Sequence, residues 1–249
     1  MNLSFKSVMR LIGMTMIVPV VISHISCSYS KPEILSNVID PNTQSIAFFW
    51  KNEKGEPLKS LANLKQFVES QKLTLTFAMN GGMYDKKNRP IGLYMENGLE
   101  LNKLNTRQVK PNQNGVVPNF YIQPNGVFYI TQNKQAGICK TSDFGMVQDV
   151  KYATQSGPLL VIDSAINSAF RKGSDNREIR NGVGILPNNQ VVFAMSKGRI
   201  SFYDFADHFR SLGCRHALFL DGVVSQTYLP DQNWRETGGD FGVMIGIVK

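Results

Sequence analysis

The chain has 249 residues, the size of one domain or at most two small ones. Hydrophobic residues make up 42% of it, which is enough to build a core and excludes wholesale disorder. The formal net charge is +8, but the basic residues are scattered without a Lys/Arg run, so we expect no nucleic-acid partner. Three cysteines are too few for a disulfide scaffold.

Residues 1–28 have the pattern of a signal peptide. Lys6 and Arg10 precede an apolar run from Leu11 to Ile22, and small residues follow it. The run is too short for a membrane span, which needs about 20 residues. We therefore expect an exported protein, periplasmic or secreted. Lipidation of Cys27 is the alternative, and only in that case do we expect contact with a membrane. It is less favoured because His24 stands where lipoproteins have an aliphatic residue.

Residues 29–44 are polar and contain two prolines, which predicts a leader into a domain at 45–249. Ser45–Trp50 is expected to be a strand. Apolar residues at three- and four-residue spacing predict a helix over 58–70, and alternation predicts a strand over 73–79.

Beyond residue 80 the pattern is mostly β. Turn residues predict one hairpin between 120–122 and 127–131 and another between 182–186 and 191–196. Ser201 and Asp204 predict the start of a helix that ends at Gly213. Further strands are expected at 158–162, 217–220 and 241–248, with a polar loop over 163–177. The fold class is α+β: a single domain with a mixed or antiparallel sheet and a few helices.

Two glycine-containing segments follow or precede strands in the first two thirds of the chain. The amides of Gly81 and Gly82, after Asn80, are suited to an anion nest, although a tight turn is the alternative. Ser156, before Gly157, offers a nucleophile or a hydrogen-bond donor, and an ordinary serine turn is the alternative.

Two more segments carry charged groups. Arg180, with Arg177 nearby, offers a guanidinium that can bind phosphate through two hydrogen bonds, unless it forms a surface salt bridge. In a strand, Arg180 and Asn181 face opposite sides. Asp221 ends an apolar strand, where its pKa can rise as a general acid needs, although Asp-Gly is also a common turn.

Together and in this order, four motifs resemble the phosphodiester glycosidase family, in particular a small bacterial exported branch. They are NGGMY at 80–84 with Pro90 and Gly92, SGP at 156–158, RNGVG at 180–184 and GCRHALFLDG at 213–222. The resemblance covers about residues 77–247. It implies an exported hydrolase that cleaves the glycosidic bond of a sugar phosphodiester, with a role in cell-envelope glycoconjugate metabolism as one setting.

One departure from the family concerns the loop after Asp221. Many members have LDGGGS there, whereas this chain has Val223 and Val224 in place of two glycines. Valine disfavours positive φ, so this loop is not expected to approach a ligand as a glycine-rich loop does. An inactive protein that binds sugar or phosphate is therefore the alternative function.

The resemblance and the residue chemistry together assign roles as a hypothesis. Asp221 is the nucleophile or the base for water, Arg180 binds phosphate, and Ser156 completes the catalytic set. The substrate-binding set is Asn80, Gly81, Gly82, Gly157, Arg177, Gly222 and Ser225. A second carboxylate is not assigned, and the candidates are Asp85, Glu96, Asp175 and Glu178.

No cofactor is required by any spacing, and no metal ligand is assigned. Asp and Asn oxygens suit Mg²⁺ or Ca²⁺, so a divalent cation stays open, whereas zinc at His208, Cys214 and His216 is disfavoured. A Cys139–Cys214 disulfide also stays open. A serine esterase that uses Ser156 with His208 or His216 is a third alternative for the function.

Overall fold

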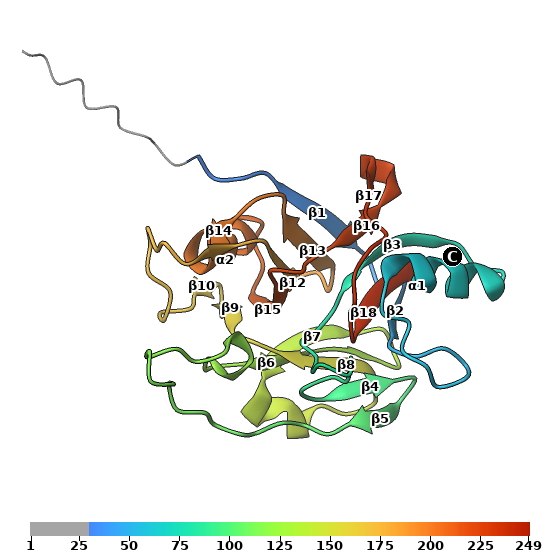
Figure 1. Ribbon diagram of the computed structural model, residues 1–249, viewed down its shortest axis with the longest axis horizontal. Helices are drawn as coiled ribbons and strands as arrows, with labels where there is room; N and C mark the ends of the chain where they lie inside the picture. Colours follow the sequence, from blue (N-terminus) through green and yellow to red (C-terminus); the bar gives the residue numbers. More distant parts are fainter. Residues whose placement is uncertain (1–29) are drawn as a thin grey trace, which may run out of the picture. The chain divides into compact units, whose positions relative to one another are not determined.

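The computed structural model describes residues 30–249, and residues 31–249 form one compact unit. The predicted signal peptide and Cys27 lie outside the described residues. Three antiparallel sheets build this unit (Figure 1). The first sheet runs in the order β1 (Ile34–Ile39), β13 (Val191–Ser196), β12 (Arg180–Ile185), β15 (His216–Gly222), β9 (Leu159–Ile162) and β10 (Ala165–Ile166).

The other two sheets carry the remaining long strands. The second has the order β17 (Trp234–Arg235), β16 (Thr227–Leu229), β3 (Leu75–Asn80), β18 (Met244–Val248) and β2 (Ser45–Phe49). The third, which lies lowest in Figure 1, has the order β5 (Leu99–Asn102), β4 (Tyr94–Glu96), β8 (Val150–Ser156), β6 (Gly126–Thr131) and β7 (Ala136–Lys140). A small pair joins β11 (Arg177–Glu178) to β14 (Ile200–Ser201).

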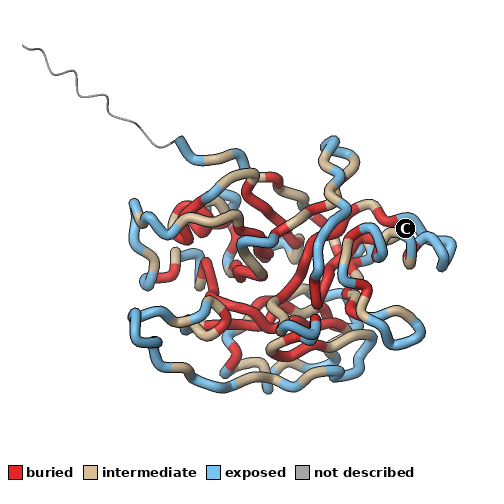
Figure 2. Tube along the Cα trace, viewed as in Figure 1, coloured by how far each residue is buried: buried red, intermediate tan, exposed pale blue. Residues whose placement is uncertain are grey.

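The main core lies where the three sheets face one another. Phe193 of the first sheet contacts Phe77 of the second and Phe128 of the third, with ring centroids 5.2 Å and 5.9 Å apart. Phe48 of β2 contacts Phe128 at 5.6 Å. These rings are at most 2% exposed, and the buried trace in Figure 2 follows the same strands. The inward residues of the alternating strands therefore form one core.

Each helix covers the outer face of one sheet. Helix α2 (Phe202–Ser211) packs Phe205 and Phe209 against Gly182 and Gly184 of β12, and helix α1 (Leu61–Ser70) packs on the second sheet. Ser201 caps α2, since its Oγ accepts from the amide of Asp204 at 3.1 Å, as predicted. Three short 3₁₀ turns complete the elements: η1 (Asn119–Tyr121), η2 (Thr141–Met146) and η3 (Pro230–Gln232). The predicted α+β single domain is confirmed.

The domain begins earlier than predicted. The segment expected to be a leader contains β1, which pairs with β13 from Ile34↔Ser196 to Ile39↔Val191. Leu35 and Ile39 are buried in the sheet. The prediction was wrong because polar residues and prolines flank the strand and conceal its alternation.

The first predicted hairpin is also wrong. Residues 119–121 form η1, in which the amide of Tyr121 donates to Pro118 O at 2.9 Å, and β6 pairs instead with β7 and β8. Turn residues such as those at 123–126 do not by themselves determine which strand becomes the partner of β6. The second hairpin, β12 with β13, is confirmed.

The described cysteines are both free thiols. Cys139 lies on β7, whereas Cys214 lies under α2 against Gly184. A disulfide between them, which the sequence left open, is therefore not formed. No helix within residues 30–249 has the length and apolar character needed to cross a membrane.

Candidate active site

Three strands from two sheets end side by side and bring Asn80, Asn181 and Asp221 together. The Asn80 amide Nδ2 donates to Asp221 Oδ2 at 3.0 Å. Asn181 Nδ2 donates to Asn80 Oδ1 at 2.9 Å and to Asn80 O at 2.8 Å, while Asn181 Oδ1 accepts from the Asp221 amide at 2.8 Å. Both asparagine side chains are fully buried. Their hydrogen bonds hold the Asp221 carboxyl in one orientation.

A β-bulge explains why Asp221 faces Asn80. Along β15, Phe219 pairs with Gly182 and Asp221 pairs with Asn181, so Leu220 is the extra residue. Phe219 points into the α2 layer, and strict alternation would turn Asp221 to that same side. The extra residue reverses the phase, and Asp221 joins Asn181 on the inner face. Bulges re-aim side chains in this way beside functional sites.

The electrostatics of Asp221 fit acid–base chemistry. Burial raises the pKa of this carboxyl to about 7, while hydrogen bonds from the Gly222 amide, at 2.7 Å, and from Asn80 lower it in part. The residue as a whole is only partly buried. A carboxyl with a pKa near neutrality and with limited access can exchange protons at working pH.

Tyr84 is a site residue that the sequence analysis did not single out. Its pKa is raised to about 12, first by burial and then by the negative charges of Asp221 and Asp240. The phenol therefore stays protonated and can donate a hydrogen bond beside Asp221. Asn181 was likewise missed as a site residue. Its position across from Asp221 in the sheet could have been inferred only from the strand register.

Ser156, which the sequence analysis placed in the catalytic set, makes a structural contact. Its buried hydroxyl donates to Leu220 O at 2.7 Å, which ties β8 to the bulge of β15. Neither described histidine reaches it: His208 Nε2 lies 2.8 Å from Ser36 Oγ, and His216 faces Asp163. The geometry therefore does not support the serine esterase alternative. Ser225 Oγ donates to Asp221 O at 3.3 Å, so this predicted residue lies next to Asp221.

The glycines near the site serve close packing. The amide of Gly81 donates to Val243 O at 2.8 Å, and a Cβ at Gly81 would lie 2.4 Å from Ile245 Cγ1. A Cβ at Gly82 would lie 2.6 Å from Thr154 Oγ1, and one at Gly157 would lie 2.5 Å from Asn125 Cβ. The Gly81 amide is therefore not available for the predicted anion nest. Gly222, by contrast, contributes its amide to Asp221.

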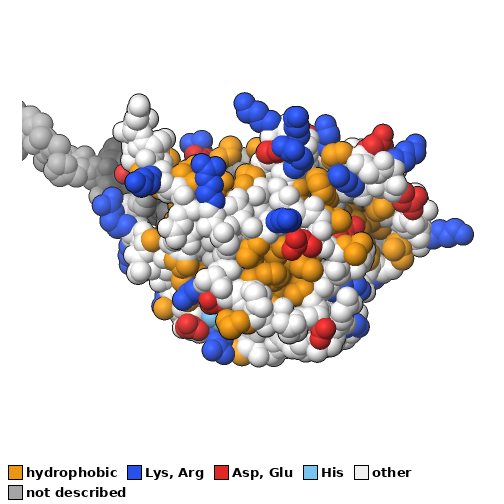
Figure 3. Space-filling model, turned by 90° about the horizontal axis from the view of Figure 1, so that it is seen from below, with side chains coloured by type: hydrophobic (Ala, Val, Ile, Leu, Met, Phe, Trp, Pro, Cys, Tyr) orange, Lys and Arg blue, Asp and Glu red, His pale blue; other side chains and the backbone are white. Residues whose placement is uncertain are grey.

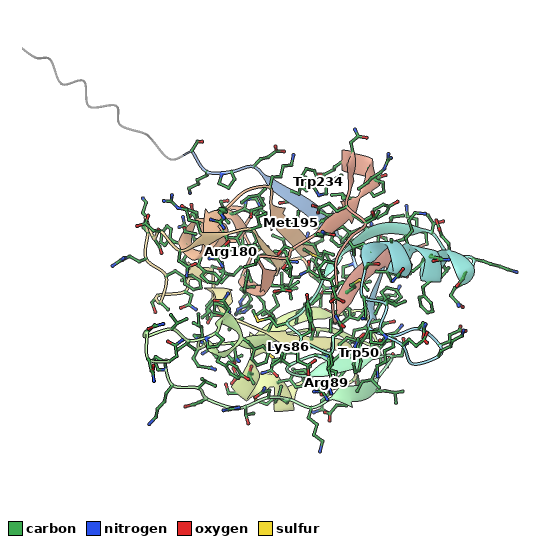
Figure 4. The ribbon with its side chains drawn as sticks, in the orientation of Figure 1. Trp50, Lys86, Arg89, Arg180, Met195 and Trp234 are labelled. Carbon is green, nitrogen blue, oxygen red and sulfur yellow. The ribbon has the colours of Figure 1, made fainter. Side chains whose placement is uncertain are left out.

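Arg180 lies on the opposite face of β12 from Asn181. Its guanidinium is 3.6 Å from the ring centroid of Phe202, and Nε donates to Ile200 O at 2.9 Å. Figure 4 shows it beside α2 and β14, well apart from Lys86 and Arg89 of the loop after β3. Arg177 lies on β11, paired in register with Ser201. Arg180 and Asp221 thus lie on opposite faces of the first sheet.

Within residues 30–249, no hydrogen bond or ion pair joins any of the four candidate second carboxylates to Asp221. Asp85 pairs with Arg89 at 2.7 Å, Glu178 pairs with Arg199 at 3.5 Å, and Glu96 accepts from Tyr94. Asp175 is exposed. Among residues 30–249, no group of three or more His, Cys, Asp or Glu side chains could hold a metal ion.

The loop after Asp221 contains a backbone conformation that valine rarely adopts. Val223 has φ of 62° and is 70% exposed, and Val224 is 47% exposed. The amide of Val223 donates to Ile179 O at 3.1 Å, which keeps the loop against β11 and β12. Val223 thus adopts a left-handed conformation, although the sequence analysis expected valine to disfavour positive φ at this loop.

Comparison with known proteins places this chain in a family. A model of the phosphodiester glycosidase family matches residues 74–247. YigE, an uncharacterized protein of Escherichia coli K12, is 34% identical over 206 residues, which are 82% of this chain and 78% of YigE. The range matched by the family model includes Asn80, Asn181 and Asp221.

Solved structures share the fold at low sequence identity. The catalytic domain of zebrafish N-acetylglucosamine-1-phosphodiester alpha-N-acetylglucosaminidase, auto-inhibited by its pro-peptide, has a TM-score of 0.57 at 14% identity, covering 88% of this chain and 85% of that one. A hypothetical Synechocystis protein has a TM-score of 0.55 at 14% identity (86% and 59%). A Burkholderia pseudomallei K96243 protein described as exported has 0.55 at 10% (86% and 73%). The family model, which spans more than half of the chain, establishes that this protein belongs to the phosphodiester glycosidase family.

Proposed function

We propose that the protein is an exported hydrolase that cleaves the bond between a sugar and the phosphate of a phosphodiester. The observation that carries this proposal is the Asp221 carboxyl, held by Asn80 and the Gly222 amide with its pKa raised to about 7. Family membership supports the reaction class. Residues 1–28 support action outside the cytoplasm, with cell-envelope glycoconjugates as the expected substrates.

In this mechanism Asp221 acts in its ionised form. Glycoside cleavage proceeds through an oxocarbenium-like transition state. The leaving phosphate monoester is already a weak base, so the main demand is on the attacking side. Ionised Asp221 either attacks the anomeric carbon or takes a proton from the attacking water. Asn80 and Asn181 act as positioning residues, because their amides are bonded to each other and to Asp221.

The phosphate is assigned to Arg180. This arginine lies across the sheet from Gly222, the neighbour of Asp221, at the ends of β12 and β15. A substrate that reaches around these strand ends places its sugar at Asp221 and its phosphate on the Arg180 side. Ser225 and the Tyr84 hydroxyl border the sugar position. Ser156 and the closely packed Gly81, Gly82 and Gly157 hold the strand ends in place.

The test is a substrate panel with the purified mature protein. The panel contains sugar 1-phosphodiesters, UDP-sugars and p-nitrophenyl sugars, each with Mg²⁺, with Ca²⁺ and with a chelator. We expect hydrolysis of phosphodiesters only, with a rate that rises as the pH passes about 7. Asp221→Asn should lower kcat by at least about a thousandfold. Asp163→Asn, at an exposed aspartate, is the matched control and should retain full activity.

The same experiment distinguishes hydrolysis from the alternative function, which is binding without turnover. The exposed Val223–Val224 pair beside Asp221 favours a protein that binds sugar phosphates without turnover. That alternative is supported if the wild type hydrolyses no substrate while sugar phosphates raise its Tm. Full activity in Asp221→Asn would contradict the proposed mechanism.

A further inference from the structure

Asp240 lies on the segment that leads into β18, beside the loop that follows β3. The two strands are antiparallel, and Met244 of β18 pairs with Asn80 of β3. Two residues before Met244, a Cβ added to Gly242 would lie 2.5 Å from Tyr84 Cβ. The chain before β18 therefore runs alongside residues 80–84 in the opposite direction and brings Asp240 close to Tyr84.

A buried asparagine fixes the position of this aspartate. Asn88 Nδ2 donates to Asp240 Oδ1 at 3.0 Å and to Asp240 O at 2.9 Å. Asn88 is only 5% exposed, and its own carbonyl oxygen accepts from Trp50 Nε1 at 2.7 Å. The preceding Gly239 has φ of 107°, which side chains rarely allow. The Asp240 carboxylate is thus held in one place although it lies on an exposed loop.

The second oxygen of this carboxylate is open to a ligand. Within residues 30–249, Oδ2 of Asp240 has no hydrogen-bond partner, because Asn88 and Lys59 both approach Oδ1. Lys59 Nζ lies 3.9 Å away, and the two side chains are 51% and 75% exposed. An exposed ion pair of this kind contributes little. Asp240 therefore keeps an acceptor and most of its negative charge.

Tyr84 connects Asp240 to the active site. The negative charges of Asp221 and Asp240 both contribute to the raised pKa of the Tyr84 phenol, after burial, so both carboxylates lie near the same hydroxyl. The Tyr84 hydroxyl borders the position proposed above for the sugar. Asp240 thus stands next to that position, where none of the four carboxylates considered from the sequence is bonded to Asp221.

The charges around the sugar position define the sugar that fits it. Arg180 packs against Phe202 on the opposite face of the first sheet, so its guanidinium does not offset the two carboxylates here. A carboxylate accepts hydrogen bonds from hydroxyl groups, and such charge-assisted bonds are stronger than neutral ones. A sugar that itself carries a carboxylate meets like charges, which are strongly unfavourable in a binding site.

We propose that Asp240 is a substrate-binding residue that accepts hydrogen bonds from the sugar hydroxyls and makes the site select uncharged sugars over uronic acids. This assignment rests on the proposed function, because it places the sugar beside Asp221. Asp221 then acts at the anomeric carbon, while Asp240 holds the hydroxyl groups. Binding itself does not require turnover.

The first experiment measures binding to the mature Asp221→Asn protein by calorimetry, so that no hydrolysis interferes and Asp221 contributes no charge. The ligands are the methyl phosphodiesters of glucose 1-phosphate and of glucuronic acid 1-phosphate, with the same pair in the galactose series. Each pair differs only at C6. We expect the uncharged sugar to bind at least about tenfold more tightly in one series or both. Equal binding within each pair, or no binding of any ligand, would overturn the proposal.

The second experiment adds Asp240→Asn to the same protein. Asparagine keeps an oxygen that can accept from Asn88 and removes only the charge. We expect the uncharged sugar to bind at least about threefold more weakly and most of the preference over the uronic acid to disappear. Asp163→Asn, at an exposed aspartate, is the matched control and should change neither quantity. If Asp240→Asn weakened both members of a pair equally, its role would be structural and the proposal refuted.

Hydrolysis by the wild type separates this proposal from the proposed function. Selective binding that Asp240→Asn abolishes, in a protein that cleaves none of the four phosphodiesters, would support the role of Asp240 and refute the proposed function alone. Cleavage of both members of each pair with equal kcat/KM would support the proposed function and refute the role of Asp240 alone.

Discussion

At the scale of single residues, Asp221 and Val223 both occupy unfavourable states beside each other. Asp221 is a carboxyl whose ionised form is penalised by burial, and Val223 is a β-branched residue at φ of 62°. Unfavourable states of this kind persist where the surrounding structure imposes them, and they cluster at functional sites. The effect of each state on stability can be measured with one substitution.

Asp221→Asn should change how stability depends on pH. The folded pKa of about 7 lies above the ordinary value near 3.9, so the folded state binds the proton more tightly. The wild type is therefore stabilised fully below about pH 4 and loses this contribution as the pH rises to 7, by at most about 1.4 kcal/mol per pH unit. The variant lacks this dependence. Urea unfolding of both proteins between pH 5 and 8 measures the difference, and parallel curves would contradict the raised pKa.

Val223→Gly should stabilise the protein. A non-glycine residue in the left-handed region costs about 1–2 kcal/mol, and glycine gives back about 0.5–1 kcal/mol through the entropy of the unfolded chain. We expect a net gain near 0.5–1 kcal/mol, seen as a Tm higher by about 1–4 °C. Val224→Gly, whose φ is not positive, is the matched control and should not raise Tm. A lower Tm for Val223→Gly would show that Val223 makes a contact that outweighs its strain.

At the scale of elements, the fit of α2 on β12 depends on residues without side chains. A Cβ at Gly184 would lie 2.6 Å from Cys214 Sγ and 2.7 Å from Phe209 Cδ1. Both neighbours are buried, so neither can move without shifting α2. The same helix supplies Phe202, whose ring lies 3.6 Å from the Arg180 guanidinium.

Gly184→Ala should therefore destabilise the protein by about 1–3 kcal/mol through overpacking. Gly145→Ala is the control, because nothing lies within 4 Å of a Cβ there. Denaturant unfolding of both variants gives the comparison. The close packing described for α2 would be refuted if Gly184→Ala were as stable as Gly145→Ala.

At the scale of the whole molecule, the three sheets share one core. The face seen in Figure 3 carries scattered charges and no continuous basic patch. Figure 3 shows hydrophobic side chains gathered near the centre of that face and Lys and Arg side chains spread mostly around it. The edge strand β1 belongs to the folded unit, and Lys31 before it reaches Asp204 at 3.2 Å and Asp207 at 3.1 Å on α2.

The limits of the domain can be tested by truncation. A chain starting at residue 31 keeps β1, whereas a chain starting at residue 45 loses Leu35 and Ile39 and exposes the edge of β13. Two buried aliphatic side chains contribute about 3–6 kcal/mol, a large part of the 5–15 kcal/mol typical of a domain. We expect the first chain to unfold cooperatively and the second to aggregate or to lose several kcal/mol. Equal stability would show that β1 is dispensable.

The sequence by itself determined the features that depend on local patterns. Apolar runs and alternation located the long strands β2, β3, β6, β9, β12, β13, β15 and β18. Turn chemistry located the β12–β13 hairpin, and the Ser201 cap located α2. The ordered motifs indicated the family and pointed to Asn80 and Asp221. Local signals suffice for these because periodicity, capping and turns act over only a few residues.

Only the tertiary structure decided how those segments meet. The bulge at Leu220 turns Asp221 toward Asn80, while Arg180 faces α2, and both outcomes depend on strand register. The partner of β6 and the inclusion of β1 likewise depend on pairing between residues far apart in the chain. Register and long-range pairing are set by the burial of side chains in the shared core, and no short segment encodes that burial alone.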